Sequence, residues 1–202
     1  MKNKFILIIF SLILSIPFFV QAYAPQKRLL FFLPYEGYSA NQFNKLYEAF
    51  LEQGYTVDAV SASVGTAKSE NNAESLSMPL TSSADNSKIT AGVTTIQSIS
   101  RNRFSQNYDG FICIGGTGGE AYFYDGFFTG TAGLSDAVVA EAASALNEII
   151  NEAVLLDKII GGLEFGAGLI GYAKLDGSST NSVLKNKNAT TWDYNQTLVT
   201  AF

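Results

Sequence analysis

One segment, residues 158–170, constrains the fold more than any other part of the chain. It begins with β-branched and small apolar residues, reaches a single acidic residue, Glu164, and continues with Gly166, Gly168 and further apolar residues. Such a run is typical of α/β proteins in which a buried strand turns sharply into a helix and presents one side chain above the sheet. Because that side chain faces the positive end of a helix dipole, the segment predicts a site that favours an anion.

Upstream segments predict a parallel sheet with helices. Residues 29–33 form a continuous apolar run, which is typical of a central strand buried on both faces. A helix is expected from its cap Ser39 to Gly54, because its apolar side chains recur every three or four residues. A second strand is expected at 56–61. These elements make a βαβ unit, so we predict a single α/β domain with a mainly parallel sheet between helices.

The later elements are predicted from the same patterns. Residues 63–87 are rich in Ser, Asn, Ala and Thr and are expected to form a surface excursion. Beyond them we expect a short strand or hairpin arm at 88–95, a helix at 96–104, a buried strand at 111–114, a helix from Ser135 to Ala153, and strands at 189–193 and 197–202.

The first 22 residues predict a secretory signal peptide, with a basic start, an apolar stretch over 5–20 and small residues before a cleavage point after Ala22. A membrane anchor is the weaker alternative, because this stretch is interrupted by Ser and Pro and falls short of the roughly 20 residues that a spanning helix needs. We therefore expect residues 1–22 to be removed. Residues 23–202 would form the mature domain, periplasmic or secreted by a bacterium, with no membrane association.

Composition excludes several classes of function. From residue 23 onward the chain has 11 basic and 18 acidic residues, a net charge of −7, so we expect no nucleic acid partner. There is no histidine, which excludes Ser-His-Asp and Cys-His triads and the usual zinc sites. The only cysteine, Cys113, lies in an apolar run and is expected to be a buried core residue. We expect neither a metal nor a cofactor.

Residues 116–121 fit the dinucleotide fingerprint G-x-G-x-x-A, with Asp136 standing 20 residues after Gly116. A genuine fingerprint opens a helix directly, whereas residues 122–133 are rich in aromatic residues and glycine. We therefore interpret the glycines as a tight turn close to Glu164. The aromatic residues 122–128 either line a ligand pocket, through Tyr122 and Tyr124, or pack against a helix or a second subunit of a homodimer.

Residues 29–37, residues 108–116 and the segment around Glu164 together resemble the ThiJ/PfpI (DJ-one/PfpI) superfamily. The resemblance implies a flavodoxin-like three-layer sandwich of the class I glutamine amidotransferase-like kind. In that family a glutamate of the first strand approaches a cysteine at a strand-to-helix elbow, usually followed by histidine, so Glu36 is expected at the C-terminal end of the first strand. Here Glu164 and Phe165 stand where the family has Cys-His. The family's deglycase, glyoxalase and peptidase activities should therefore not be transferred.

By the same resemblance Glu36 matches the family's glutamate, and Gly115 and Gly116 match its Gly-Gly turn. If Glu36 and Glu164 face each other, one carboxyl group is expected to keep its proton, because like charges in a partly buried site cannot both ionise cheaply. The pair would then suit acid-base catalysis, with Gly115, Gly116 and the Phe165 N–H available for an oxyanion. The first interpretation is instead a non-catalytic protein, a pseudoenzyme that binds a small molecule or a partner. In a third interpretation Glu164 does not face Glu36 at all.

Overall fold

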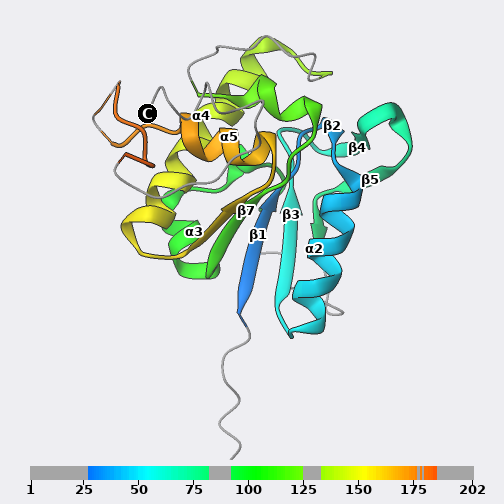
Figure 1. The fold of residues 1–202 in the computed structure, drawn as a ribbon, viewed down its shortest axis with the longest axis horizontal. Helices are drawn as coiled ribbons and strands as arrows, with labels where there is room; N and C mark the ends of the chain where they lie inside the picture. Colours follow the sequence, from blue (N-terminus) through cyan, green and yellow to red (C-terminus); the bar gives the residue numbers. More distant parts are fainter. Residues whose placement is uncertain (1–26, 82–91, 125–132, 177, 179, 186–202) are drawn as a thin grey trace, which may run out of the picture.

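The computed structural model describes residues 27–81, 92–124, 133–176, 178 and 180–185, and its centre is a five-stranded sheet (Figure 1). The strand order is β6-β3-β1-β7-β8. All neighbours pair in parallel except β6, which is antiparallel to β3. The mainly parallel sheet predicted from the sequence is therefore confirmed. Its strands are β1 (Arg28–Phe32), β3 (Thr56–Val60), β6 (Leu80–Thr81), β7 (Gly110–Cys113) and β8 (Ile159–Gly162).

Strand β1 is buried on both faces, as its continuous apolar run predicts. Because successive side chains of a strand point to opposite faces, Leu29 and Phe31 enter one apolar core while Leu30 and Phe32 enter the other. All four side chains have no solvent exposure. The two cores are the two spaces between the sheet and its helical layers.

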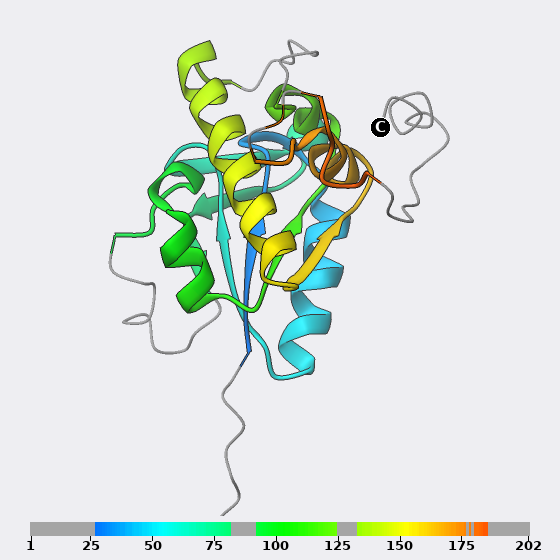
Figure 2. The same ribbon diagram turned by 90° about the vertical axis from the view of Figure 1, so that its left-hand side faces the viewer.

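The helices form the outer layers of a three-layer sandwich, with α2 on one face and α3, α4 and α5 on the other (Figures 1 and 2). On the first face the ring of Phe43 from α2 packs edge-on against Phe31 at a centroid distance of 6.3 Å. The second face holds apolar residues of the other three helices, such as Phe104, Leu146 and Leu169. The helices are α2 (Ala40–Glu52), α3 (Arg101–Asn107), α4 (Asp136–Leu155) and α5 (Phe165–Tyr172).

The surface excursion predicted at 63–87 is mostly exposed or half-buried over its described part, but it also forms strands that the sequence did not predict. This part contains most of a second, three-stranded sheet of order β2-β4-β5, as well as β6 of the main sheet. Its strands are short and contribute few large side chains to the core, Ala67 and Met78 being buried. The apolar pattern therefore gave little signal. The second sheet consists of β2 (Glu36–Tyr38), β4 (Gly65–Ser69) and β5 (Ser75–Met78), and the single-turn 3-10 helix η1 (Glu70–Asn72) lies at the tip between β4 and β5.

Two further predictions need correction. The helix expected at 96–104 is divided into a 3-10 turn, η3 (Ile96–Ser98), and α3, because the Ser100 side chain accepts a hydrogen bond from the Arg103 N–H and starts a new helix. The described end of the arm expected at 88–95 is a turn and not a strand, with Gly92 at φ 85°. The predicted helices at Ser39 and Ser135 and the predicted strands at 56 and 111 are confirmed to within two residues.

Three predictions lie outside the described residues: the signal peptide at 1–22, the aromatic residues 125–128, and the strands at 189–193 and 197–202. Among the helices that are described, none combines the length and the apolar character needed to cross a membrane.

Candidate functional site

The strand order places the candidate site residues at one edge of the main sheet. The chain moves from β1 to β3 on one side and later from β3 across β1 to β7, so the order reverses beside β1. In open parallel sheets, ligands bind at the carboxyl ends of the strands next to such a reversal. The segments that leave these ends carry Glu36 after β1, Gly115 and Gly116 after β7, and Glu164 after β8.

Glu164 occupies a sharp elbow between β8 and α5. Its backbone has φ 49° and ψ −119°, a conformation that residues other than glycine rarely adopt. The residue is exposed and immediately precedes the first residue of α5, Phe165. At the start of the helix the Gly166 and Ala167 N–H groups donate to the carbonyl oxygens of Leu163 and Glu164, at 2.7 and 3.0 Å. The strand-to-helix turn predicted from the sequence is present.

Two glycines make this elbow sterically feasible. A Cβ atom at Gly162 would lie 2.4 Å from the carbonyl oxygen of Gly166, and one at Gly166 would lie 2.2 Å from the carbonyl oxygen of Cys113. Both contacts involve backbone atoms, so neither could be relieved by moving a side chain. The sequence signal is the spacing Gly162-x-Glu164-x-Gly166, which has the form of the nucleophile elbow G-x-S-x-G with glutamate at the reactive position. The role of Gly162 was missed in the sequence analysis.

Gly115 and Gly116 form the tight turn that the sequence predicts beside the elbow. A Cβ atom at Gly115 would lie 2.3 Å from the carbonyl oxygen of Leu163 and 3.0 Å from the Cβ of Glu164. Gly116 has φ 110°, and a Cβ there would lie 2.3 Å from the carbonyl oxygen of Gly37. The chain then enters a short 3-10 helix, η4 (Thr117–Tyr122), in place of the long helix that a dinucleotide fingerprint requires.

Gln42 is a site residue that sequence analysis missed. The spacing Ser39-x-x-Gln42 at the start of α2 has the form of a capping box, in which Gln42 would bond back to the Ser39 N–H. Instead, the Ser39 N–H donates to the carbonyl oxygen of Gly115 at 2.9 Å, and the Gly115 N–H donates to Oε1 of Gln42 at 3.1 Å. The glycine turn thus takes the place of the capping partner. The Gly115 N–H, which was expected to donate a hydrogen bond to an oxyanion, therefore already donates to Gln42.

Glu36 begins β2 of the second sheet and does not lie at the end of the first strand, from which Leu33, Pro34 and Tyr35 separate it. Its carboxylate lies 3.6 Å from Nζ of Lys68, and the two side chains are 34% and 49% exposed. A Cβ at Gly133 would lie 2.3 Å from the Glu36 carboxyl carbon, so the backbone before α4 covers this group. Among the described residues, no hydrogen bond or ion pair links Glu36 with Glu164. The shared-proton pair stays a prediction.

The described aromatic residues at the end of η4, 122–124, lie partly in the core and partly at the surface. Tyr122 is buried, packs edge-on against Phe32 at 5.2 Å, and its hydroxyl accepts a hydrogen bond from the Tyr35 N–H at 3.4 Å. Burial raises the pKa of Tyr122 to about 12. Phe123 is also buried and stacks on Tyr172 of α5, whereas Tyr124 is 41% exposed. Phe123 therefore packs against a helix, as one alternative predicts, while Tyr122 packs against β1 in the core; a ligand contact by Tyr122 or Tyr124 stays a prediction.

Two features limit the chemistry of the site. Cys113 has no exposure, and burial raises the pKa of its thiol far above the ordinary value, so it stays protonated and inaccessible. Across the part of the chain that the structure describes, no group of three or more histidine, cysteine or acidic side chains is placed to hold a metal ion.

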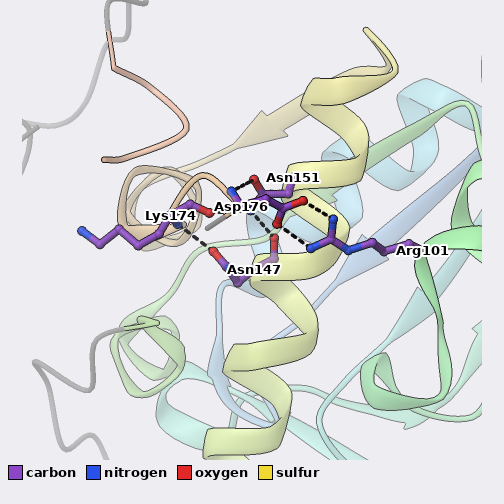
Figure 3. Close-up of polar contacts among 5 residues, drawn as sticks. All are labelled: Arg101, Asn147, Asn151, Lys174 and Asp176. Carbon is purple, nitrogen blue, oxygen red and sulfur yellow. Dashed lines mark hydrogen bonds and ion pairs between the residues drawn. The ribbon is translucent and has the colours of Figure 1, made fainter. Parts of the chain in front are cut away.

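The segment that follows the elbow helix is fastened to α4 by asparagine side chains (Figure 3). Oδ1 of Asn147 accepts from the Lys174 N–H at 2.7 Å. Nδ2 of Asn151 donates to the Lys174 carbonyl oxygen at 2.6 Å, and its Oδ1 accepts from the Asp176 N–H at 3.1 Å. The Asp176 carboxylate also accepts two hydrogen bonds from Arg101 of α3, which lower its pKa. These bonds fix the end of α5, whose first residue follows Glu164.

The layers, the strand order and the elbow define a flavodoxin-like α/β sandwich with one side chain presented at a strand-to-helix turn. No family model matches the sequence and no curated protein matches it, but solved structures share its fold. One is a ThiJ/PfpI domain protein from Brachyspira murdochii, with TM-score 0.61, 14% identity, and coverage of 88% of this chain and 76% of that protein. Another is a protein provisionally named protease I from Bacteroides thetaiotaomicron, with TM-score 0.58, 12% identity, and coverage of 86% and 78%. The protein therefore has the ThiJ/PfpI fold.

Proposed function

We propose that this protein is an exported member of the ThiJ/PfpI superfamily that lacks the family's Cys-His chemistry and binds a small molecule or a partner at the elbow. The observation that carries the proposal is a strand-to-helix elbow that presents Glu164. The chain has no histidine, and its one cysteine is buried in the sheet. A carboxylate is a poor nucleophile toward carbonyl groups, so an elbow carrying Glu164 is better suited to holding a ligand than to covalent catalysis.

The surroundings of the elbow support binding over catalysis. An oxyanion hole needs backbone donors that remain free for the reacting oxygen, and the Gly115 N–H donates to Gln42. The ion-pair partner of the Glu36 carboxylate is Lys68, at 3.6 Å, and not Glu164. Export is supported only by the signal-like composition of residues 1–22 and would place the protein in the periplasm or outside the cell.

The second candidate is an acid-base enzyme, a lyase, isomerase or hydrolase, that uses Glu36 and Glu164. It is favoured by one observation: both residues follow carboxyl ends of parallel strands at the same edge of the sheet. In such an enzyme one carboxyl group would donate a proton while the other accepts one. The two candidates differ in what Glu164→Gln would do. A catalytic protein would keep ligand affinity and lose turnover, whereas a binding protein would lose affinity and show no turnover in either form.

The elbow itself is tested by chemical labelling of Glu164→Cys. A thiol at a helix N-terminus has a lowered pKa, so iodoacetamide should alkylate this variant at neutral pH about tenfold faster than Glu141→Cys on the exposed face of α4. Cys113 of the unmodified protein should not react while the protein is folded. Equal rates for the two introduced thiols would remove the physical basis of the proposed site.

The ligand is sought by screening small molecules for thermal stabilisation of the unmodified protein and of Glu164→Gln. A compound that stabilises only the unmodified protein, and that NMR spectra show to remain unchanged, supports binding without catalysis. Conversion of the compound by the unmodified protein, with no conversion by Glu164→Gln, would establish the acid-base enzyme instead.

A further inference from the structure

A polar cavity of about 290 Å³ lies between β2, the tip of the β4–β5 hairpin and the start of η4. Its walls come from segments distant in sequence, and Glu164 is not among them. Besides two glycines, it is lined by Glu36, Ser69, Glu70, Asn71, Asn72 and Thr117.

The hairpin tip is fixed to η4 by a carboxylate. Oε1 of Glu70 accepts a hydrogen bond from the Thr117 N–H at 2.8 Å, so one wall of the cavity is bonded to the opposite wall. Asn71 and Asn72 both adopt left-handed backbone conformations, with φ 59° and 54°, which asparagine tolerates better than most residues. The cavity therefore has a defined shape before any ligand arrives.

The lining selects one class of ligand. It contains two carboxylates and two side-chain amides; Lys68 lies outside the lining but pairs with the Glu36 carboxylate at 3.6 Å, so the unpaired charge that repels phosphate or carboxylate groups is that of Glu70. It also has no aromatic or aliphatic side chain on which an apolar ligand could pack. Carboxylate, amide and hydroxyl oxygens are acceptors, which match the three N–H donors of an ammonium group.

We infer that this cavity binds the ammonium group of a small primary amine. The inference goes beyond the proposed binding function, because Glu164, which carries that function, is not part of the cavity wall. The acidic net charge of the chain, −5 for the full sequence, would further favour cations over anions near the opening. A divalent metal ion fits less well, since within the described ranges no group of three histidine, cysteine or acidic side chains is placed to hold one.

The test is a titration of the 15N-labelled protein with putrescine and, separately, with 1,4-butanediol, which has the same carbon chain but hydroxyl groups in place of amines. Putrescine should shift the backbone amide signals of Asn71, Asn72, Thr117 and Gly118 and should saturate in the millimolar range. The diol should leave these signals in place. Calcium chloride, titrated in the same way, should shift them less than putrescine does.

A matched pair of variants locates the binding site. Glu70→Gln removes the charge but keeps an oxygen for the Thr117 N–H, so the hairpin tip should stay attached while putrescine affinity falls about tenfold. Glu52→Gln, in the last turn of α2 and outside the cavity, should leave affinity unchanged. Equal affinity of the Glu70→Gln and unmodified proteins would overturn the inference.

Three other results would also overturn it: equal shifts with the diol, tighter binding of calcium, or no shift at about 50 mM putrescine, where even a dissociation constant of a few millimolar would saturate the site. Glu164→Gln separates this inference from the proposed function, because it should abolish binding at the elbow but leave putrescine binding unchanged. If putrescine fails while a ligand that depends on Glu164 still binds, only the cavity inference is lost.

Discussion

Oε1 of Gln42 accepts a hydrogen bond from the backbone N–H of Gly115 at 3.1 Å, across the interface between the first turn of α2 and the glycine turn after β7. The return bond, from the Ser39 N–H to the Gly115 carbonyl oxygen at 2.9 Å, makes the contact reciprocal. Both polar groups of a buried glycine are thus satisfied by the start of a helix. A Cβ on Gly115 would clash with the elbow, so the Gly115 backbone lies directly against Glu164. The two hydrogen bonds of Gly115 therefore fix the backbone on which the elbow packs.

Replacing Gln42 by alanine should lower the free energy of unfolding by about 1–3 kcal/mol, because the buried Gly115 N–H would lose its acceptor. Urea denaturation measures the change. Gln106→Ala is the matched control: the Gln106 amide donates to Asn102 on the exposed face of α3, so its loss should stay within about 0.5 kcal/mol. Similar small losses in both variants would mean that water replaces Gln42 without cost.

The backbone of Glu164 should be under strain, and glycine should relieve it. Non-glycine residues held in rare conformations cost about 1–3 kcal/mol, and the entropic penalty of glycine is about 0.5–1 kcal/mol. Glu164→Gly should therefore raise stability by about 1 kcal/mol, as measured by urea denaturation. Glu141→Gly, on the exposed face of α4, should lower stability by about 1 kcal/mol. A loss in both variants would show that the elbow does not strain Glu164.

The helices and strands that the sequence predicts correctly are those in which large apolar side chains recur in a regular pattern. The run at Leu29 and the 3.6-residue period after Ser39 each depend on burial of large apolar side chains, and these elements were located within two residues. The elbow at Glu164 was visible because glycine is needed where backbones approach closely. What these features share is a local steric or hydrophobic requirement that fixes residue types along a continuous stretch.

The parts that were missed depend on contacts between distant segments. β4 and β5 bury few large side chains, and neither the pairing of β4 with β2 nor that of β5 with β4 is marked by an apolar period. Gln42 has the spacing of a local cap, but its partner is a glycine 73 positions away. The cavity beside Glu70 likewise exists only because the hairpin tip meets η4. Such long-range polar contacts leave no repeat in the sequence from which they could be inferred.

Two buried tyrosines should make the protein sensitive to alkali. Burial raises the pKa of both Tyr38 and Tyr122 to about 12, against about 10 for an unfolded tyrosine. Between these values the folded state binds more protons at the two phenols than the unfolded state does, so the contribution of the tyrosines to stability should be constant below pH 10 and fall as the pH rises toward 12. Urea midpoints at pH 8, 10 and 11.5 measure the decline.

The double variant Tyr38→Phe, Tyr122→Phe should show a flatter decline over the same pH range, because it lacks both phenols. In addition, the buried Tyr38 hydroxyl has no hydrogen-bond partner among the described residues, so Tyr38→Phe alone should be neutral or stabilising at pH 8. An unchanged slope in the double variant would assign the alkaline loss to other groups.

Asn151 should be among the most sensitive polar residues outside the sheet. It is 6% exposed, and its amide bonds to the Lys174 carbonyl oxygen, the Asp176 N–H and the Asn147 carbonyl oxygen. Asn151→Ala would remove a donor to the carbonyl oxygen of the buried residue Lys174 and the acceptor of the Asp176 N–H, so stability should fall by about 2–4 kcal/mol. Asn102→Ala on the exposed face of α3 should change it by less than about 0.5 kcal/mol.

Amide hydrogen exchange distinguishes a local role of Asn151 from a role in positioning the elbow. Because residues 174–176 follow α5 directly, loosening them should speed exchange in α5 back toward Phe165, while β1, held by both of its neighbours, should keep its protection relative to global unfolding. Faster exchange confined to residues 174–176 would show that the elbow is held by its glycine contacts alone. Faster exchange reaching Phe165 would show that α4 holds Glu164 in place through Asn151.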